Sequence, residues 1–238
     1  MRIFSRSKRP WPDKGHFSGH PDQCYGHITY AQGGEDLIIA SVFNLLDIHH
    51  PSYLDIGAHH PFNISNTALL CARGSRGVNV EANPDLISNF RLYRPYDVTL
   101  NVAVGPEPGT AKFYRIDRWS GRNTLSLASA EEFTRAHPHF LIEDEIEVPV
   151  VTINNIIREH CCGAWPDFLS IDCEGMDFAI LASADFSRCS PQIVCVERAV
   201  TEERNCAKLL KERGYVSYAR TWANMIMLRE DVWRQMDL

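Results

Sequence analysis

Hydrophobic positions along the chain gather in short runs, separated by segments with helical spacing. Each of four such runs stops abruptly at a small or acidic residue, as a buried parallel strand does at its carboxyl end. The runs and the residues that end them are 53–56 with Gly57, 77–80 with Glu81, 168–171 with Asp172, and 193–196 with Glu197. The pattern therefore predicts four strands that are covered on both faces.

Helix signals lie between and around these runs. Ser65 or Asn66 can cap a helix that passes through Leu69 and Leu70, and Gly74 is placed to end it. A second helix is predicted to begin at proline 84, because proline suits a first helical turn. Two more helices are predicted at 37–46, after acidic residues 35 and 36, and at 202–213, before glycine 214.

The alternation of strand and helix signals predicts one α/β domain with a mostly parallel, doubly wound sheet. With 238 residues, of which 45% are hydrophobic, the chain is long enough for one sizeable core. We expect residues 1–29 to form an N-terminal extension and residues 30–238 to form the domain. An insertion at about 105–149 carries two extra strand signals, at 111–116 and 147–152. Because insertions at a ligand-binding edge usually shape specificity, this one is predicted to cover the substrate.

Charge and cysteine content narrow the functional class. The net charge of −6 gives no basic surplus, which argues against a nucleic-acid partner. No stretch approaches the roughly 18 apolar residues of a membrane span, and the basic start MRIFSRSKRPWPDKGH has no apolar segment behind it. We therefore expect a cytoplasmic protein. The eight cysteines are scattered, which favours reduced thiols over a disulfide framework.

The loop after the first predicted strand indicates the type of cofactor. It reads GAHHP at 57–61 and lacks the G-x-G-x-x-G spacing that brings backbone amides against a pyrophosphate. A dinucleotide is therefore disfavoured. S-adenosylmethionine has no phosphate and tolerates a bulkier loop, provided that Asp55 and Glu81 stay available. Glu81 lies roughly 20 residues beyond the first turn, where a carboxylate can accept hydrogen bonds from both ribose hydroxyls.

Carboxylates also mark the ends of the later strands. The segment DFLSIDCEGMD at 167–177 delivers Asp172 and Glu174 to the end of its strand, and the next run ends in Glu197. Because the carboxyl ends of parallel strands meet at one edge of a sheet, we expect these acidic residues to converge on one crevice. Taken singly, Asp172 or Glu197 would fit a structural helix cap equally well.

Five separated blocks carry a likeness to a known family. They are YAQGGEDLII at 30–39, YLDIGAHHPFNISNT at 53–67, GVNVEANP at 77–84, LNVAVG at 100–105 and SIDCEGMDFAIL at 170–181. In order and spacing they resemble the FkbM-type methyltransferases, with Cys173 as a departure where the family often has a branched aliphatic residue. The resemblance implies a class I methyltransferase Rossmann-like fold with an antiparallel last strand near 225–228. It also implies S-adenosylmethionine as the cofactor.

The resemblance further implies roles for individual residues. The residues expected to bind the cofactor are Asp55, Gly57, Ala58, Asn66, Glu81, Ala82, Asn101, Ala103 and Asp172. Among them, Glu81 would hold the ribose, and Asn101 with Ala103 would lie beside the adenine. Asp172 and Glu174 would face the transferring methyl group.

The expected reaction is direct displacement, in which an acceptor oxygen attacks the methyl group and gives its proton to a base. Asp172 and Glu174 are the predicted bases, and His59 or His60 is the alternative. A divalent cation such as Mg²⁺, held by Asp172 and Glu197, could instead lower the pKa of the hydroxyl.

Acceptor contacts are expected from the start of the domain and from the insertion. They are Tyr30, Gln32, Asp36, His60, Trp119, Arg122 and Asn123. Asp36 also fits a purely structural role, because an acidic residue at a helix start meets the positive end of the helix dipole. The resemblance favours a saccharide hydroxyl, in a glycan or a glycosylated metabolite, with lipids, peptides and polyketides as alternatives.

Two other functional classes are compatible with the residues alone. Clustered carboxylates would suit a metal-dependent hydrolase or nuclease, and the same cradle could belong to a cofactor-binding module without catalysis. Separately, His16, His20, Cys24 and His27 have a spacing that could fit tetrahedral zinc. Their stretch lacks a second paired motif, so the sequence favours no metal site there.

Overall fold

A computed structural model describes residues 28–198 and 205–236. The candidate zinc ligands His16, His20, Cys24 and His27 lie outside the described residues, together with nearly all of the predicted N-terminal extension. Seven of the eight cysteines are described, and all seven are free thiols, with Cys195 and Cys206 buried.

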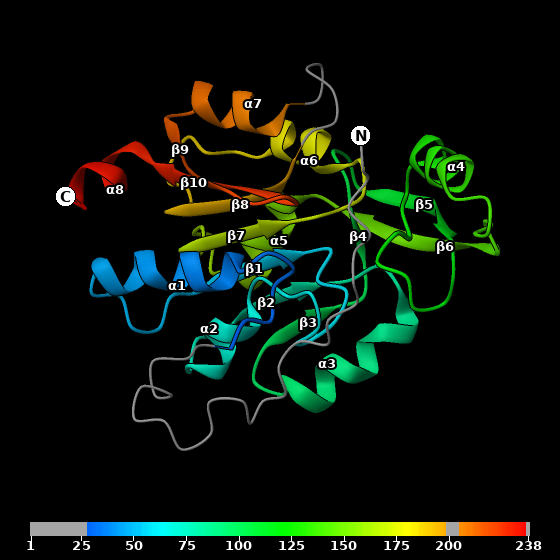
Figure 1. Cartoon of the computed structure of the whole chain (residues 1–238), viewed down its shortest axis with the longest axis horizontal. Helices are drawn as coiled ribbons and strands as arrows, with labels where there is room; N and C mark the ends of the chain where they lie inside the picture. The colour runs from blue at the N-terminus through cyan, green and yellow to red at the C-terminus, as the bar shows by residue number, and fades with distance from the viewer. Residues whose placement is uncertain (1–27, 199–204, 237–238) are drawn as a thin grey trace, which may run out of the picture.

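Strands and helices alternate through the described chain, as the sequence predicts (Figure 1). The strands of the main sheet are β1 (Tyr53–Ile56), β2 (Gly77–Val80), β3 (Val98–Leu100), β7 (Phe168–Ile171), β8 (Ile193–Glu197), β9 (Tyr215–Arg220) and β10 (Asn224–Arg229). The helices around it are α1 (Glu35–Leu45), α2 (Ala68–Ala72), the 3-10 helix η2 (Pro84–Leu86), α3 (Ile87–Tyr93), α5 (Ile153–His160), α6 (Asp177–Ser183), α7 (Cys206–Glu212) and α8 (Glu230–Gln235). The sequence did not predict β3, β9, α5, α6 or α8.

The main sheet has seven strands in the order β3-β2-β1-β7-β8-β10-β9. β10 runs antiparallel to both of its neighbours, whereas the pairs from β3 to β8 are parallel. This confirms the expected parallel sheet with an antiparallel last strand. The strand order reverses between β1 and β7, and in open α/β sheets such a switch point is where ligands bind.

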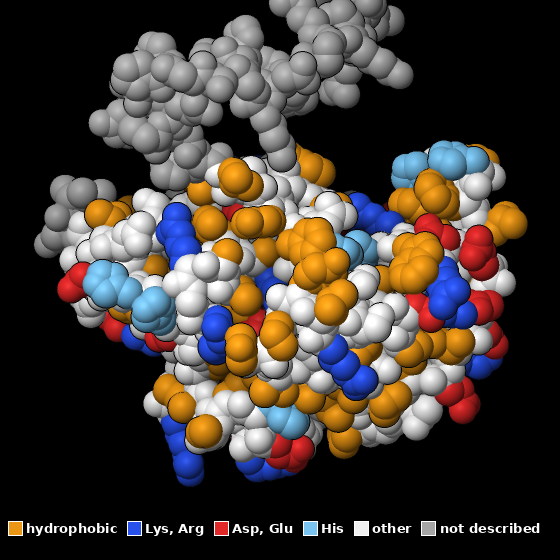
Figure 2. Space-filling model, turned by 90° about the horizontal axis from the view of Figure 1, so that it is seen from below, with side chains coloured by type: hydrophobic (Ala, Val, Ile, Leu, Met, Phe, Trp, Pro, Cys, Tyr) orange, Lys and Arg blue, Asp and Glu red, His pale blue; other side chains and the backbone are white. Residues whose placement is uncertain are grey.

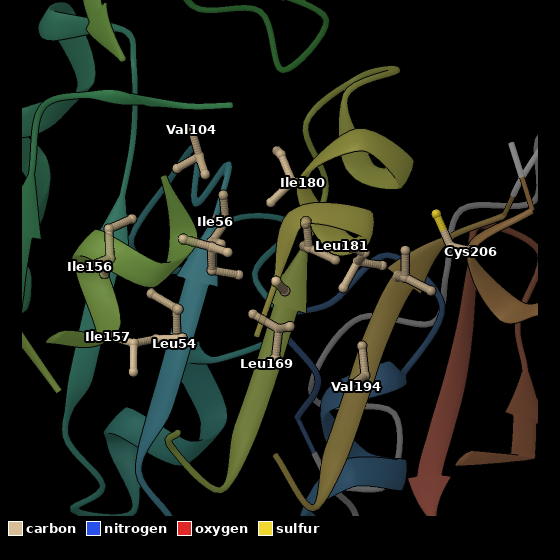
Figure 3. Packing of buried hydrophobic residues seen from close by; sticks show 14 of the residues in the cluster. Leu54, Ile56, Val104, Ile156, Ile157, Leu169, Ile180, Leu181, Val194 and Cys206 are labelled. Atoms are coloured by element: carbon tan, nitrogen blue, oxygen red, sulfur yellow. The ribbon is translucent and has the colours of Figure 1, made fainter. Parts of the chain in front are cut away.

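Alternate residues of the central strands pack against helices on opposite faces of the sheet. Leu54 and Ile56 of β1 belong to one hydrophobic cluster with residues of α5, α6 and α7, and Figure 3 shows the labelled side chains of this cluster spread along the sheet. Tyr53 of the same strand packs in a second cluster with α1 and α2. Because both faces are covered, most positions are apolar, which explains the hydrophobic runs in the sequence. The polar exceptions Asp55, Asn79 and Ser170 are buried and pair across the sheet.

The register of the parallel strands aligns the residues at their ends. Ile56 of β1 pairs with Val80 of β2 and with Ile171 of β7, and Ile171 pairs in turn with Val196 of β8. The next residue of each strand therefore stands in one row along the carboxyl edge of the sheet. That row consists of Gly57, Glu81, Asp172 and Glu197.

The insertion forms a second sheet beside this edge (Figure 1). Its strands β4 (Ala103–Val104), β5 (Gly109–Arg115) and β6 (Asp144–Val151) lie in the order β4-β6-β5. The sequence predicts the two long strands but not the helix α4 (Leu127–Ala136) between them. Ser126 caps that helix, because its Oγ accepts a hydrogen bond from the Ser129 amide at 3.2 Å.

Charged residues of both signs are mixed on the face shown in Figure 2, where hydrophobic side chains are scattered among them. Among the helices that the structure describes, none has the length and apolar character needed to cross a membrane.

Candidate active site

Two cavities open at the carboxyl edge of the sheet, next to the switch point. The smaller one, the inner cavity, has a volume of about 60 Å³, and its walls include Glu81, Ala82, Ala103, Phe113, Leu125 and Met176. The larger one, the outer cavity, has a volume of about 570 Å³, and its walls include Gln32, Asn66, Arg122, Glu174, Glu197 and Trp222. The inner cavity is therefore mostly apolar, whereas the outer cavity is polar and charged.

The two cavities share a short stretch of wall. Gly57, His59, Gly121 and Asp172 line both of them. These residues come from the loop after β1, from the insertion and from the end of β7. The two cavities are therefore immediate neighbours, and we call these four residues the junction.

Gly57 lets the ends of β1 and β7 approach each other closely. Its φ of +77° lies in the left-handed region, and a Cβ built on it would overlap the carbonyl oxygen of Asp172. The amides of Gly57 and Ala58 both donate to the Val80 carbonyl at 3.0 Å, which fixes the loop on β2. Only glycine tolerates both the left-handed φ and the close approach of the Asp172 carbonyl. A larger residue at position 57 would therefore push β1 and β7 apart at the junction.

Glu81 is held rigidly on the wall of the inner cavity. Its Oε2 accepts from the His59 amide at 2.8 Å, and its Oε1 accepts from the Asn83 amide at 2.7 Å. Burial raises the pKa of Glu81, and these two amide bonds oppose the rise by stabilising the carboxylate. Each carboxylate oxygen has a further lone pair, so the group can accept two more hydrogen bonds from a diol.

The other residues predicted near the adenine fall into two groups. Ala82 and Ala103 line the inner cavity. Asn101 acts on the backbone instead, because its Nδ2 donates to the carbonyl of Glu81 at 2.9 Å and to that of Ala82 at 3.1 Å. Asn101 therefore supports the wall that the adenine is predicted to contact.

Asp55, Ala58 and Asn66 line the outer cavity, and their expected contacts with a cofactor stay predictions. Asp55 accepts a hydrogen bond from Thr67 Oγ1 at 2.6 Å, and burial raises its pKa. Arg94, whose side chain is buried, donates to the same Thr67 oxygen at 2.9 Å. No local pattern indicates this support, since Arg94 follows α3 and reaches Thr67 across the fold.

Three carboxylates gather at the junction and along the outer cavity. Asp172, Glu174 and Glu197 each offer an oxygen atom, and these atoms lie within 4.8 Å of one another. Arg122 Nη1 lies 2.8 Å from Glu174 Oε2 and 3.8 Å from Glu197 Oε1. Asp172 Oδ1 is buried and has no hydrogen-bond partner among the described residues. The expected convergence is thus observed for these three residues, whereas Glu81 lies in the inner cavity.

Burial and mutual repulsion shift the pKa values of this cluster upward. Burial raises the pKa of Glu174 to about 7, with Asp172 adding to the rise and Arg122 opposing it. The pKa of Glu197 is also raised to about 7, by burial and then by Glu174. Burial and the neighbouring Glu197 raise the pKa of Asp172 well above its usual value. Near neutral pH the cluster can therefore both hold and accept protons.

The two histidines of the loop after β1 have different surroundings. His59 lines both cavities, and its Nε2 lies 3.0 Å from the Trp119 carbonyl oxygen, to which it can only donate. His60 Nδ1 accepts from the Asn63 amide at 3.0 Å and is absent from both cavity walls. His60 therefore shapes the loop, and the structure places His59 nearer to the junction.

The residues at the start of the domain that are predicted to contact the acceptor also differ in whether they line a cavity. Gln32 lines the outer cavity. Asp36 is buried at the start of α1, where it accepts from Thr29 Oγ1 at 2.6 Å and from the Tyr30 amide at 2.7 Å. Tyr30 and Asp36 thus secure the segment that carries Gln32, and their proposed contacts with an acceptor stay predictions.

The side-chain amide of Asn123, in the insertion, forms hydrogen bonds within its own loop. It accepts from the Ile116 amide at 2.8 Å and donates to the Asp117 carbonyl at 2.9 Å, and it lines the inner cavity. Trp119 contributes its carbonyl group to His59, while its ring is largely exposed. Of the insertion residues predicted to contact an acceptor, only Arg122 lies on the wall of the outer cavity.

One wall of the outer cavity was missed by the sequence interpretation. Arg198, Trp222 and Ala223 lie on it. The antiparallel register pairs Asn224 of β10 with Glu197, so the turn between β9 and β10 reaches the carboxyl edge. A pattern of local hydrophobicity cannot reveal this, because the contact depends on the strand order.

The fold and the cavities define the class of protein. A seven-stranded sheet in this order, with an antiparallel hairpin at one edge and cavities at the switch point, is the Rossmann-like architecture of methyltransferases. Residues 55–222 match the family described as the methyltransferase FkbM domain. The chain belongs to this methyltransferase family.

Solved structures add two distant likenesses. The methyltransferase FkbM from Methylobacillus flagellatus KT is 12% identical, with a TM-score of 0.46 over 76% of this chain and 44% of that chain. The precorrin-6y C5,15-methyltransferase from Geobacter metallireducens GS-15 is 13% identical, with a TM-score of 0.40 over 80% of this chain and 87% of that chain. This chain thus spans less than half the length of the first protein. Comparison with curated protein sequences gives no match.

Proposed function

We propose that the protein transfers a methyl group from S-adenosylmethionine to a hydroxyl group of a saccharide or a glycosylated metabolite. The observation that carries this proposal is the junction at Gly57, His59, Gly121 and Asp172, where an apolar inner cavity meets a carboxylate-rich outer cavity. The lining of the inner cavity suits a nucleoside in its chemistry, and its volume of about 60 Å³ would have to widen to admit a whole one. The lining of the outer cavity suits a polar acceptor.

The residues around the inner cavity fit the donor. The Glu81 carboxylate, fixed by two backbone amides, is placed to accept hydrogen bonds from a ribose diol. Ala82, Ala103 and Phe113 supply apolar surface for an adenine. Asp55 and Asn66 line the adjoining part of the outer cavity, where a charged amino-acid tail would find polar partners. When bound, S-adenosylmethionine supplies a methyl group activated by a positively charged sulfur.

The outer cavity supports a hydroxyl-bearing acceptor. Glu174 and Glu197 can accept hydrogen bonds from sugar hydroxyls, and Trp222 presents a ring that is 66% exposed. An exposed aromatic face beside hydrogen-bonding groups can bind an amphipathic ring such as a sugar.

The protein's contribution to the reaction is positioning and proton acceptance. The acceptor oxygen forms the new bond to the methyl carbon as the bond from that carbon to sulfur breaks, and the hydroxyl proton passes to a carboxylate. Positioning the two reactants can lower the barrier by several kcal/mol. Glu174 is the favoured base, because its pKa of about 7 matches neutral conditions. Asp172 lies at the junction itself, and His59 is the alternative base.

The donor half of the proposal is tested by calorimetry with S-adenosylmethionine and S-adenosylhomocysteine on the purified chain. We expect both to bind with one site per chain. Methyl-labelled donor incubated with a panel of saccharides, glycosides, lipids and peptides then identifies the acceptor. If neither ligand binds and another nucleotide occupies the inner cavity in crystals, the proposal is wrong.

A further inference from the structure

The carboxylate cluster contains a positive charge of its own. Arg122 Nη1 lies 2.8 Å from Glu174 and 3.8 Å from Glu197, and its charge also opposes the upward pKa shift of Asp172. The other arginine of the outer cavity, Arg198, donates to the Trp222 carbonyl at 2.9 Å. Within the described part of the chain, Arg122 is thus the cation that all three carboxylates share.

The insertion is built to hold Arg122 in this place. Thr124 Oγ1 donates to the backbone carbonyl of Glu174 at 2.8 Å, so the same loop binds Glu174 through its backbone and through its side chain. The turn at Gly175, with a φ of +99°, packs against Ser129 so closely that a Cβ there would overlap the serine hydroxyl. The hydrogen bonds of Asn123 fix the residues before it.

When it is ionised, a cluster of this kind needs a cation. Three carboxylates with oxygens within 4.8 Å repel one another, and in many proteins such a set binds a divalent metal ion through hard oxygen ligands. Here the guanidinium already contacts two of the three. A metal ion between Asp172 and Glu197 would lie next to this fixed positive charge, which disfavours its binding.

We propose that Arg122 is the built-in cation of this cluster, and that it takes the place of a divalent metal ion in positioning Glu174 and Glu197 around the acceptor. Its role in catalysis rests on the proposed methyl transfer. Its role as the cation of the cluster does not, and can be measured without donor or acceptor. Arg122 is therefore a positioning residue supplied by the insertion.

This proposal is tested by titrating Mn²⁺ into the chelator-washed full chain and monitoring its binding by electron paramagnetic resonance. We expect wild type to bind Mn²⁺ weakly at this cluster. Arg122→Ala and Arg122→Gln should each gain a single site, roughly tenfold tighter or more, that disappears when Asp172→Asn is added. Arg122→Lys keeps the charge and should gain no site. Arg118→Ala is the matched control, since Arg118 lies on the same loop but pairs with Asp85 at 2.9 Å.

Two results would overturn the proposal. One is a tight Mn²⁺ site in wild type that Asp172→Asn removes, and the other is no gain of a site in either neutral variant. Donor calorimetry on the same samples reports separately on the proposed function, because Arg122 lies outside the inner cavity walls. Once an acceptor is known, chelator should leave wild-type turnover unchanged, and Arg122→Lys should retain more kcat than Arg122→Gln.

Discussion

The inner and outer cavities meet at one junction but are built in different ways. The inner cavity takes about a third of its walls from β1, β2 and the segments that directly follow them, where neighbouring backbone amides fix Glu81. The rest of its walls comes from residues 102–104, the insertion and the segment after β7. The outer cavity combines the start of the domain, the insertion, the ends of β7 and β8 and the turn between β9 and β10. The wall at Glu81 is thus a local structure, whereas the outer cavity is assembled from distant parts of the chain.

This difference teaches where variation is tolerated. Changing the β9–β10 turn alters the outer cavity, whereas changing the insertion alters both cavities. In either case the register of β1, β2 and β7 keeps Gly57, Glu81 and Asp172 aligned. The two cavities should therefore respond separately to substitution, except at the junction and in the insertion.

Asp172→Asn should have the largest effect. It removes the carboxylate at the junction without changing its size, so turnover should fall by roughly 10²–10⁴-fold. Donor affinity should change by only a few fold, since Glu81 and the loop after β1 are untouched. Methyl-transfer assays with labelled donor and calorimetry measure the two quantities. Wild-type turnover in this variant would remove Asp172 from the mechanism.

Gly57→Ala should damage both cavities, because the added Cβ would push β1 away from the Asp172 carbonyl. We expect donor affinity to fall by roughly 100-fold and the free energy of unfolding to fall by about 1–3 kcal/mol. Gly163→Ala is the matched control. Its φ of +73° imposes a similar backbone strain, but no atom lies within 4 Å of the added Cβ. Equal losses in calorimetry and urea unfolding for both variants would show that the contact at the junction is unimportant.

Glu81→Ala tests whether donor affinity depends on the inner cavity alone. Losing hydrogen bonds to a charged group costs about 1.5–3 kcal/mol, so donor affinity should fall by roughly 10–100-fold. Glu197→Gln is the comparison on the acceptor side, and it should leave donor affinity within a few fold. Calorimetry with S-adenosylhomocysteine measures both variants. Wild-type affinity in Glu81→Ala would contradict the assignment of the ribose to this carboxylate.

The sequence could predict the local structure well. Mainly apolar runs revealed β1, β2, β7 and β8, because burial on both faces leaves only single polar residues within each strand. The strand-end residues Glu81 and Asp172 followed from the same runs. Their shared edge then required only the rule that ligands bind at the carboxyl ends of parallel strands.

The features that the sequence could not predict depend on strand order or on contacts across the fold. β9 alternates buried and exposed positions weakly, and nothing near Trp222 indicates that its turn lies beside Glu197. Arg122 and Asn123 are neighbours in sequence, but their side chains have different partners. Arg122 contacts Glu174, whereas Asn123 forms hydrogen bonds within its own loop. Such differences depend on how the insertion packs, which residue type and spacing do not specify.

The pH dependence of turnover sharpens the comparison within the outer cavity. A base must be unprotonated, so a carboxylate with a pKa of about 7 places the acid limb of kcat/KM near pH 7, far above the usual 4.5 of a glutamate. Below that limb the rate should fall about tenfold per pH unit. Glu174→Gln then separates the two glutamates, because Glu174 contributes to the raised pKa of Glu197. If Glu174 is the base, the variant loses turnover at every pH; if Glu197 is the base, turnover survives and the limb moves to lower pH. A wild-type limb near pH 4.5 would exclude both.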